Sequence, residues 1–188
     1  LAQVLKLDAQ LKRTGAASAN VGNAISFSQT QDGFLQKVQT ALERMSELTV
    51  LGQDVTKSNT DRSNYSVEFT QLQNYISDIG GKDFNGVTLF SSAGTATLGV
   101  TIDSDAATFG LALIDLTSSV STTGLAQIYT GVTSAITNSS SAASALSNIQ
   151  TAIQNLADMR ANVGANIQRL NMTDDQVAIY NENLSAAA

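Results

Sequence analysis

Residues 146–177 read LSNIQTAIQNLADMRANVGANIQRLNMTDDQV, and one stripe of positions advances through them by three and four residues without a break. The stripe consists of Leu146, Ile149, Ile153, Leu156, Arg160, Val163, Ile167, Leu170, Asp174 and Val177. This spacing keeps one side of an α-helix facing another helix. Each apolar side chain contributes about 1.5–3 kcal/mol when it is buried. The stripe therefore predicts a long helix over residues 145–184 that packs against a neighbour.

A helix of that length extends roughly 60 Å at 1.5 Å per residue. A compact domain of this size has a radius of gyration of only about 16 Å, so we expect an elongated molecule. Two stripe positions carry charges, Arg160 and Asp174. These side chains either reach out to solvent and fix the helix register, or they face a second subunit or a receptor.

The composition excludes several classes of function. The 188 residues contain no Cys and no His, so thiolate chemistry, disulfides, imidazole catalysis and most zinc sites are ruled out. Charged residues make up 14% of the chain and the net charge is −6, which disfavours a nucleic-acid partner. No apolar run approaches the roughly eighteen residues of a membrane span. The chain opens without Met, inside an amphipathic pattern, and we expect a fragment of a longer protein.

No motif in the sequence indicates catalysis. The carboxylate clusters at Asp103 and Asp105 and at Asp174 and Asp175 lack the acidic-residue and Gly spacing of a calcium loop. There is no Gly-rich phosphate loop and no nucleophile elbow. We therefore expect no enzyme activity, no cofactor and no metal.

The rest of the chain predicts one mainly α domain over residues 1–188 with a small β region. Its expected elements are a long helix over 1–56, a second helix over 61–79, β-hairpins over 84–116, a Ser/Thr-rich connection over 117–144 and the final helix over 145–184. Gly15, Gly22 and Gly33 each cost about 1 kcal/mol inside a helix, so the first helix either breaks near Gly33 or gains from close packing. Gly80 and Gly81 predict the end of the second helix in a left-handed conformation, and Asn85-Gly86 predicts a tight turn.

This order of elements, together with four short motifs, resembles the core of bacterial flagellin. Residues 20–33 (NVGNAISFSQTQDG), 42–48 (LERMSEL), 84–87 (FNGV) and 159–165 (MRANVGA) are similar to flagellin segments in the same order. The resemblance covers nearly the whole chain. It implies an elongated bundle of long helices plus β-hairpins, the rod-shaped inner-tube domain of the family. It has no counterpart of the outermost terminal helices and only a short stretch near Asn138 in place of the variable outer domains.

The resemblance implies a secreted, extracellular structural subunit that packs with other flagellin subunits in the bacterial flagellar filament and serves swimming motility. Without the terminal helices, we expect this chain to be monomeric. The resemblance also implies that the first helix is continuous through Gly33 and that its glycines permit close helix approach. The alternatives are the hook–filament junction protein, which shares the helical core, and a cell-surface adhesin that binds polysaccharide near Asn138 with Tyr129.

Many flagellins are recognised by a Toll-like receptor of animal hosts, and the matching positions here are Arg44, Leu48 and Glu68. An Arg beside an apolar residue is typical of an interface hot spot. The candidate receptor or subunit interface therefore comprises Arg44, Glu47, Leu48, Glu68 and Arg160. Two positions depart from the family pattern, because Glu43 replaces a Gln and Ser46 replaces a second Arg. Alternatively, Arg44 and Glu47 are solvated or pair with nearby helices.

Overall fold

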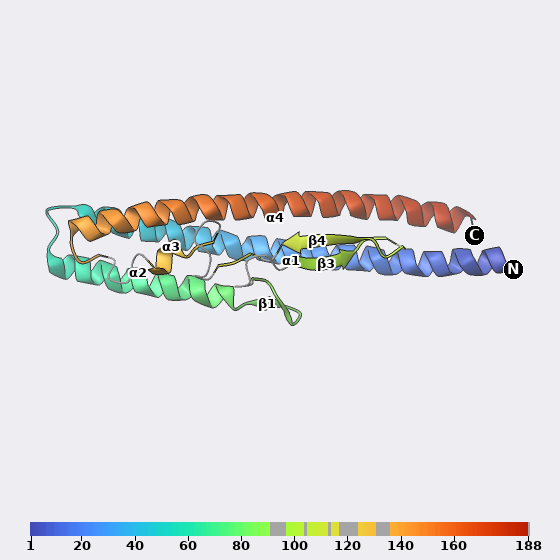
Figure 1. The fold of residues 1–188 in the computed structure, drawn as a ribbon, viewed down its shortest axis with the longest axis horizontal. Coiled ribbons are helices and arrows are strands. Elements are labelled where there is room, and N and C mark those ends of the chain that lie inside the picture. Colours follow the sequence, from blue (N-terminus) through green and yellow to red (C-terminus); the bar gives the residue numbers. More distant parts are fainter. Residues whose placement is uncertain (91–96, 104, 113, 117–123, 131–135, 188) are drawn as a thin grey trace. The chain divides into compact units, whose positions relative to one another are not determined.

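The computed structural model describes residues 1–90, 97–103, 105–112, 114–116, 124–130 and 136–187. Its elements in chain order are α1 (Ala2–Gln53), α2 (Asn59–Gly80), β1 (Asp83–Phe84), β2 (Val87–Thr88), β3 (Thr97–Thr101), β4 (Thr108–Ala112), α3 (Gln127–Thr130) and α4 (Ser139–Ala187), as Figure 1 shows. The predicted fold class, mainly α with a small β region, is confirmed.

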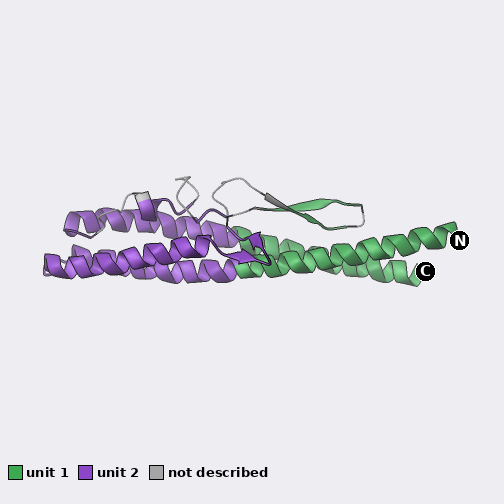
Figure 2. Cartoon of the chain, turned by 90° about the horizontal axis from the view of Figure 1, so that it is seen from below, with its two compact units in different colours: residues 1–30, 97–112, 162–188 green, residues 31–96, 113–161 purple. Residues whose placement is uncertain are grey.

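The chain divides into two compact units, coloured separately in Figure 2. Unit 1 holds residues 1–30, 97–112 and 162–188, so the N-terminal part of α1 and the C-terminal part of α4 run together beside the β3–β4 hairpin. Unit 2 holds residues 31–96 and 113–161, where α2 joins the other parts of α1 and α4. The prediction of one domain over the whole chain stays a prediction.

The α4 stripe is buried as its spacing predicts. Every seventh residue from Ala142 to Leu184 lies in the core, namely Ala142, Ile149, Leu156, Val163, Leu170, Val177 and Leu184. The remaining stripe positions, which alternate with these, are half-buried. A strict seven-residue repeat is the signature of a helix with a continuous packing seam, and here the seam is covered within the chain.

Helix α4 begins at Ser139, earlier than the predicted residue 145. The Asn138 carboxamide oxygen accepts the Ser141 backbone N–H at 2.8 Å, which satisfies one of the free donors of the first turn. Residues 139–144 therefore belong to the helix and not to the connection. Within the connection, residues 117–123 and 131–135 lie outside the described part of the chain, and residues 127–130 form the short helix α3.

Helix α1 is continuous through all three of its inner glycines, as the flagellin resemblance implied. The expectation that these glycines permit close helix approach is wrong, however. A Cβ added at Gly15, Gly22 or Gly33 would meet nothing within 4 Å, so these glycines permit no close approach. Close packing occurs instead at Gly52, where an added Cβ would collide with the Ile136 side chain and approach Ala142 at 3.1 Å.

Helix α2 has a capping box at its start. The Ser58 hydroxyl accepts the Asp61 backbone N–H at 3.1 Å, and the Asp61 carboxylate accepts the Ser58 N–H at 3.0 Å. At its end, Gly81 donates its N–H to the Asp78 carbonyl at 3.1 Å. Gly81 has φ −92°, so the predicted left-handed cap is wrong: the chain leaves the helix through an ordinary turn.

Two antiparallel hairpins form the β region. Strands β1 and β2 pair Asp83 with Thr88 and Phe84 with Val87. Between them, Asn85 and Gly86 have φ of 51° and 79°, which confirms the predicted tight turn. Strands β3 and β4 pair over five positions in unit 1, from Thr97 with Ala112 to Thr101 with Thr108.

Candidate interaction surface

Arg44 joins α1 to α2 in unit 2 through two carboxylates. Its Nε and Nη2 donate to the Glu68 carboxylate at 2.7 and 3.0 Å, and its Nη1 donates to Glu47 at 2.7 Å. The Arg44 and Glu68 side chains are 41% and 43% exposed, and that of Glu47 is 67% exposed. The sequence could suggest the Arg44–Glu47 pair, which is spaced three residues apart on one helix. The structure adds Glu68 and makes a bidentate contact of fixed geometry.

The charges of this triad reinforce one another. The hydrogen bonds that Arg44 donates to Glu68 and Glu47 raise the pKa of Arg44 above its ordinary value. The hydrogen bond from Arg44 in turn lowers the pKa of Glu68. The guanidinium is therefore held as a cation between two anions at the surface.

Leu48 does not belong to this surface. Its side chain is fully buried, with 0% exposure, in the same core as Leu42 and Met45. The prediction that Leu48 takes part in an exposed interface is wrong in the folded chain, because an apolar residue on the inner side of α1 packs against the chain's own helices. Val50, two residues further on, is 55% exposed.

Arg160 ties α4 to α1 within unit 2. Its Nε donates to the Asp32 carboxylate at 3.1 Å, and its Nη1 donates to the Gln39 side-chain oxygen at 2.6 Å. The side chains of Arg160 and Asp32 are 32% and 25% exposed. This arrangement matches the interpretation that a charge in the stripe fixes helix register, and it leaves the guanidinium engaged inside the chain.

Arg62 is a polar core residue that the sequence interpretation missed. Its side chain donates to the Gly52 carbonyl at 2.8 Å and the Asp54 carbonyl at 3.0 Å, which closes the corner between α1 and α2. A signal was present, because Arg62 lies seven residues before Phe69 and fourteen before Ile76, both fully buried. A charge on a buried stripe requires fixed partners, and carbonyls at a helix end supply them.

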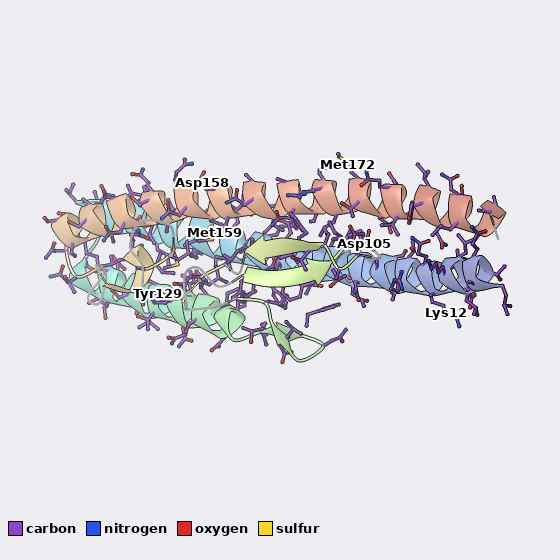
Figure 3. The ribbon with its side chains drawn as sticks, turned by 45° about the vertical axis from the view of Figure 1, so that its right-hand side comes forward. Lys12, Asp105, Tyr129, Asp158, Met159 and Met172 are labelled. Carbon is purple, nitrogen blue, oxygen red and sulfur yellow. The ribbon has the colours of Figure 1, made fainter. Side chains whose placement is uncertain are left out.

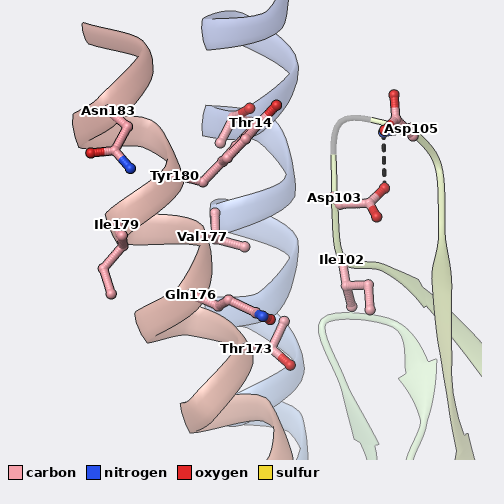
Figure 4. A pocket seen from close by; sticks show the side chains of 10 residues that line it. All are labelled: Thr14, Ile102, Asp103, Asp105, Thr173, Gln176, Val177, Ile179, Tyr180 and Asn183. Atoms are coloured by element: carbon pink, nitrogen blue, oxygen red, sulfur yellow. Dashed lines mark hydrogen bonds between the residues drawn. The ribbon is translucent and has the colours of Figure 1, made fainter. Parts of the chain in front are cut away.

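Unit 1 contains a cavity of about 500 Å³ between the two long helices and the β3–β4 turn (Figure 4). Tyr180 and Val177 of α4 line one side, and Ile102 and Asp103 of the hairpin line the other. The Asp103 carboxylate already accepts the backbone N–H groups of Asp105 and Ala107 at 2.8 and 3.0 Å. Its role in the turn is structural, and the described residues that line the cavity include no nucleophile hydrogen-bonded to a base.

The adhesin alternative would gain from exposed aromatic side chains near Asn138. Tyr129, labelled in Figure 3, has a buried hydroxyl without a hydrogen-bond partner, and burial raises its pKa. The Tyr129 side chain is half-buried, so it is not an exposed aromatic residue of the kind that would support the adhesin alternative. Met172, in contrast, projects outward from α4 and is 68% exposed (Figure 3).

Metal ions and membranes place further requirements on the described residues. They hold no group of three or more acidic, Cys or His side chains placed to bind a metal ion. Within the same residues, no helix is long and apolar enough to cross a bilayer.

Comparison with known proteins agrees with these features. The family described as the bacterial flagellin N-terminal helical region matches residues 1–95. The chain is 28% identical over 194 residues to the flagellar filament 30.7 kDa core protein of Treponema maltophilum, with 97% of this chain and 67% of that protein covered. It is 32% identical over 155 residues to a flagellin of Salmonella rubislaw, with 74% of this chain but only 31% of that protein covered.

Solved structures support the same assignment. A crystal structure of Bacillus cereus flagellin matches with a TM-score of 0.71 and 28% identity, over 91% of this chain and 95% of the other. A structure described as a flagellar hook-associated protein of Vibrio parahaemolyticus matches with a TM-score of 0.83 over 98% and 94% of the two chains. At 14% identity this second likeness shows the fold alone. Because the flagellin family matches half of the chain, and the fold is that of a flagellin, the protein belongs to the bacterial flagellin family.

Proposed function

We propose that this chain is part of a structural, non-catalytic subunit of the bacterial flagellar filament, secreted to the cell exterior, where its helices pack beside those of other subunits. The observation that carries the proposal is the pair of very long helices, 52 and 49 residues, which bury one continuous seam and leave their outer faces available. Relatives that match the chain are named as filament proteins. The chain spans only about a third of the Salmonella flagellin, so the role of the whole protein is inferred from this part.

Immunogold electron microscopy tests this proposal on the protein in its own cells. Antibodies raised against the chain are expected to label flagella along their length. Label confined to the boundary between hook and filament would instead support the junction-protein alternative. Label spread over the cell body, with unlabelled flagella, would support the adhesin. Sheared filaments and a strain lacking the gene provide the controls.

A second proposal concerns the exposed triad of Arg44, Glu47 and Glu68 as a contact surface for an animal Toll-like receptor. The supporting observation is geometric: the bidentate Glu68 contact holds the Arg44 guanidinium in one orientation while its side chain stays 41% exposed. A preordered Arg loses little freedom on binding. The glutamate at position 43, where the family has an uncharged Gln, adds a negative charge that weighs against an acidic partner surface.

A cell reporter of receptor activation tests the second proposal. Arg44→Ala is expected to reduce potency, and Arg160→Ala, which disturbs an internal contact between α4 and α1, serves as the control. Equal potency of Arg44→Ala and the unmodified protein, with circular dichroism showing both folded, would refute the receptor proposal. It would leave the filament proposal unaffected.

A further inference from the structure

The turn between β1 and β2 places a reactive pair of residues in open solvent. Asn85-Gly86 is the one Asn-Gly pair in the chain. Both residues are exposed, and a Cβ added at Gly86 would meet nothing within 4 Å. The positive φ values and the Phe84–Val87 pairing define a two-residue turn of type I′.

We propose that Asn85 is a site of spontaneous deamidation through a succinimide. The backbone nitrogen of Gly86 loses its proton to the solvent and attacks Cγ of Asn85. A new N–C bond closes a five-membered ring, the Cγ–Nδ2 bond breaks, and the side-chain nitrogen leaves as ammonia after taking up a proton. Water then opens the ring at either carbonyl and yields aspartate or isoaspartate. Gly86 favours the attack because it has no Cβ to crowd the nitrogen.

The hairpin around this pair opens at little cost. Its ladder comprises two residue pairs, extended by one hydrogen bond from the Leu89 N–H to the Lys82 carbonyl at 3.2 Å. Apart from half-buried Phe84, the side chains of residues 83–88 are exposed. A short two-stranded ribbon is marginally stable in water. The free energy of local opening at such a site is therefore small compared with that of global unfolding. Opening frees the Asn85 backbone to rotate into the geometry that attack requires.

Asn138 supplies an internal comparison, because it is also exposed and is followed by the small residue Ser139. Its carboxamide is engaged as the N-cap of α4, and its backbone N–H donates to the Ser141 hydroxyl at 3.1 Å. An N-cap stabilises the helix that it begins, so it also holds the Asn138 side chain in place. Asn85 should therefore deamidate faster than Asn138, because its turn opens more easily and because glycine follows it.

The damage is confined to the hairpin. Isoaspartate adds a methylene to the main chain, so a two-residue turn can no longer keep Phe84 opposite Val87. Directly after the hairpin, the Leu89 carbonyl accepts the buried Gln31 side-chain N–H at 2.8 Å, and Phe90 meets Phe34 edge to face at 6.4 Å. These contacts anchor residues 89 and 90 to α1 independently of the turn.

The test ages the purified protein at mildly alkaline pH and follows each asparagine by peptide mass spectrometry, with isoaspartyl methyltransferase labelling to identify the isomer. Asn85 is expected to convert about tenfold faster than Asn138, and faster still as pH rises. Asn85→Gly, which keeps a turn-compatible residue at positive φ, should remove the signal, whereas Asn138→Ala should leave it unchanged.

Three results would overturn the proposal. The first is conversion at Asn85 no faster than at Asn138 in the folded protein. The second is an intact Asn85 after a peptide of residues 82–90 has reacted completely under the same conditions. Isoaspartate label that persists in Asn85→Gly at full strength would place the modification elsewhere and count equally against it.

Discussion

Among single residues, Glu68 has the clearest energetic signature. Arg44 lowers its pKa in the folded chain, so Glu68 contributes stability above its unfolded pKa of about 4.3 and loses it as pH falls through the folded value. Glu68→Gln should therefore lower the free energy of unfolding near neutral pH, and the difference from the unmodified protein should shrink below about pH 4. Urea unfolding across a pH series measures both quantities.

The control for this prediction is Glu43→Gln. The Glu43 carboxylate accepts a hydrogen bond from the Gln39 amide at 3.2 Å on the same helix, so Glu43→Gln removes a surface carboxylate while it leaves the bond between α1 and α2 in place. If both variants shift stability equally at every pH, the ion pair between α1 and α2 has no measurable role.

Ala106 adopts an unfavourable backbone conformation, because it has φ +64° in the β3–β4 turn. The left-handed region disfavours an L side chain but not glycine. Ala106→Gly should stabilise the protein by about 0.5–1 kcal/mol, offset in part by the greater freedom of glycine in the unfolded chain. Thermal unfolding measures the change. A lower melting temperature would show that the turn does not strain this residue.

The residue-level contacts separate what sequence can predict from what it cannot. Arg44 and Glu47 share a helix face, so their pairing follows from spacing alone. Glu68 and Arg160 could be placed on helices, but their partners depend on how helices far apart in the sequence meet. Leu48 is a further example of what sequence does not show. Its position in a family motif suggested an interface, whereas its position on the inner face of α1 buries it.

At the level of elements, the glycines of α1 give a matched pair of opposite predictions. Gly33→Ala should stabilise the protein by about 0.5–1 kcal/mol, because alanine favours the helix and the new methyl group meets open space. Urea unfolding is the measurement. A destabilised Gly33→Ala would mean that an unseen contact crosses this part of the helix.

Gly52→Ala should do the reverse and destabilise by about 1–3 kcal/mol, because its methyl group would collide with Ile136. The added prediction concerns the opposing side chain: Ile136→Ala removes the Cγ2 methyl group that the new methyl group would meet, so the double variant should lose less stability than the sum of the two single variants. Strict additivity of the two substitutions would show that they do not touch.

The helices themselves were well predicted because their signals are periodic, and the errors occur where the period is weak. The first turns of α4 consist of Ser and Ala, which carry no apolar stripe, so the sequence placed its start too late. The Asn138 cap marks the true start. The end of α2 was located correctly from its glycine pair, but the backbone conformation of Gly81 depends on the hairpin that follows and could not be read from glycine alone.

For the whole molecule, the buried seam bears on the state of association. Every seventh residue of α4 from Ala142 to Leu184 is buried within this one chain, so a second chain is not needed to bury these core positions. We expect this 188-residue chain to be monomeric, with a single species of one-chain mass in light scattering. Spontaneous long filaments of this chain alone would contradict the expectation.

The tie between Arg160 and Asp32 spans 128 positions along the chain, and this separation has a kinetic consequence. Helix hydrogen bonds form between near neighbours within microseconds, whereas closing a long loop must be completed before its contacts stabilise anything. The two long helices should thus acquire most of their hydrogen bonds early, and the meeting of their distant partners should limit the rate of folding. If the Arg160–Asp32 contact forms after the folding transition state, Arg160→Met is expected to accelerate unfolding more than it slows folding. Stopped-flow measurements of both rates would show whether the contact forms before or after the transition state.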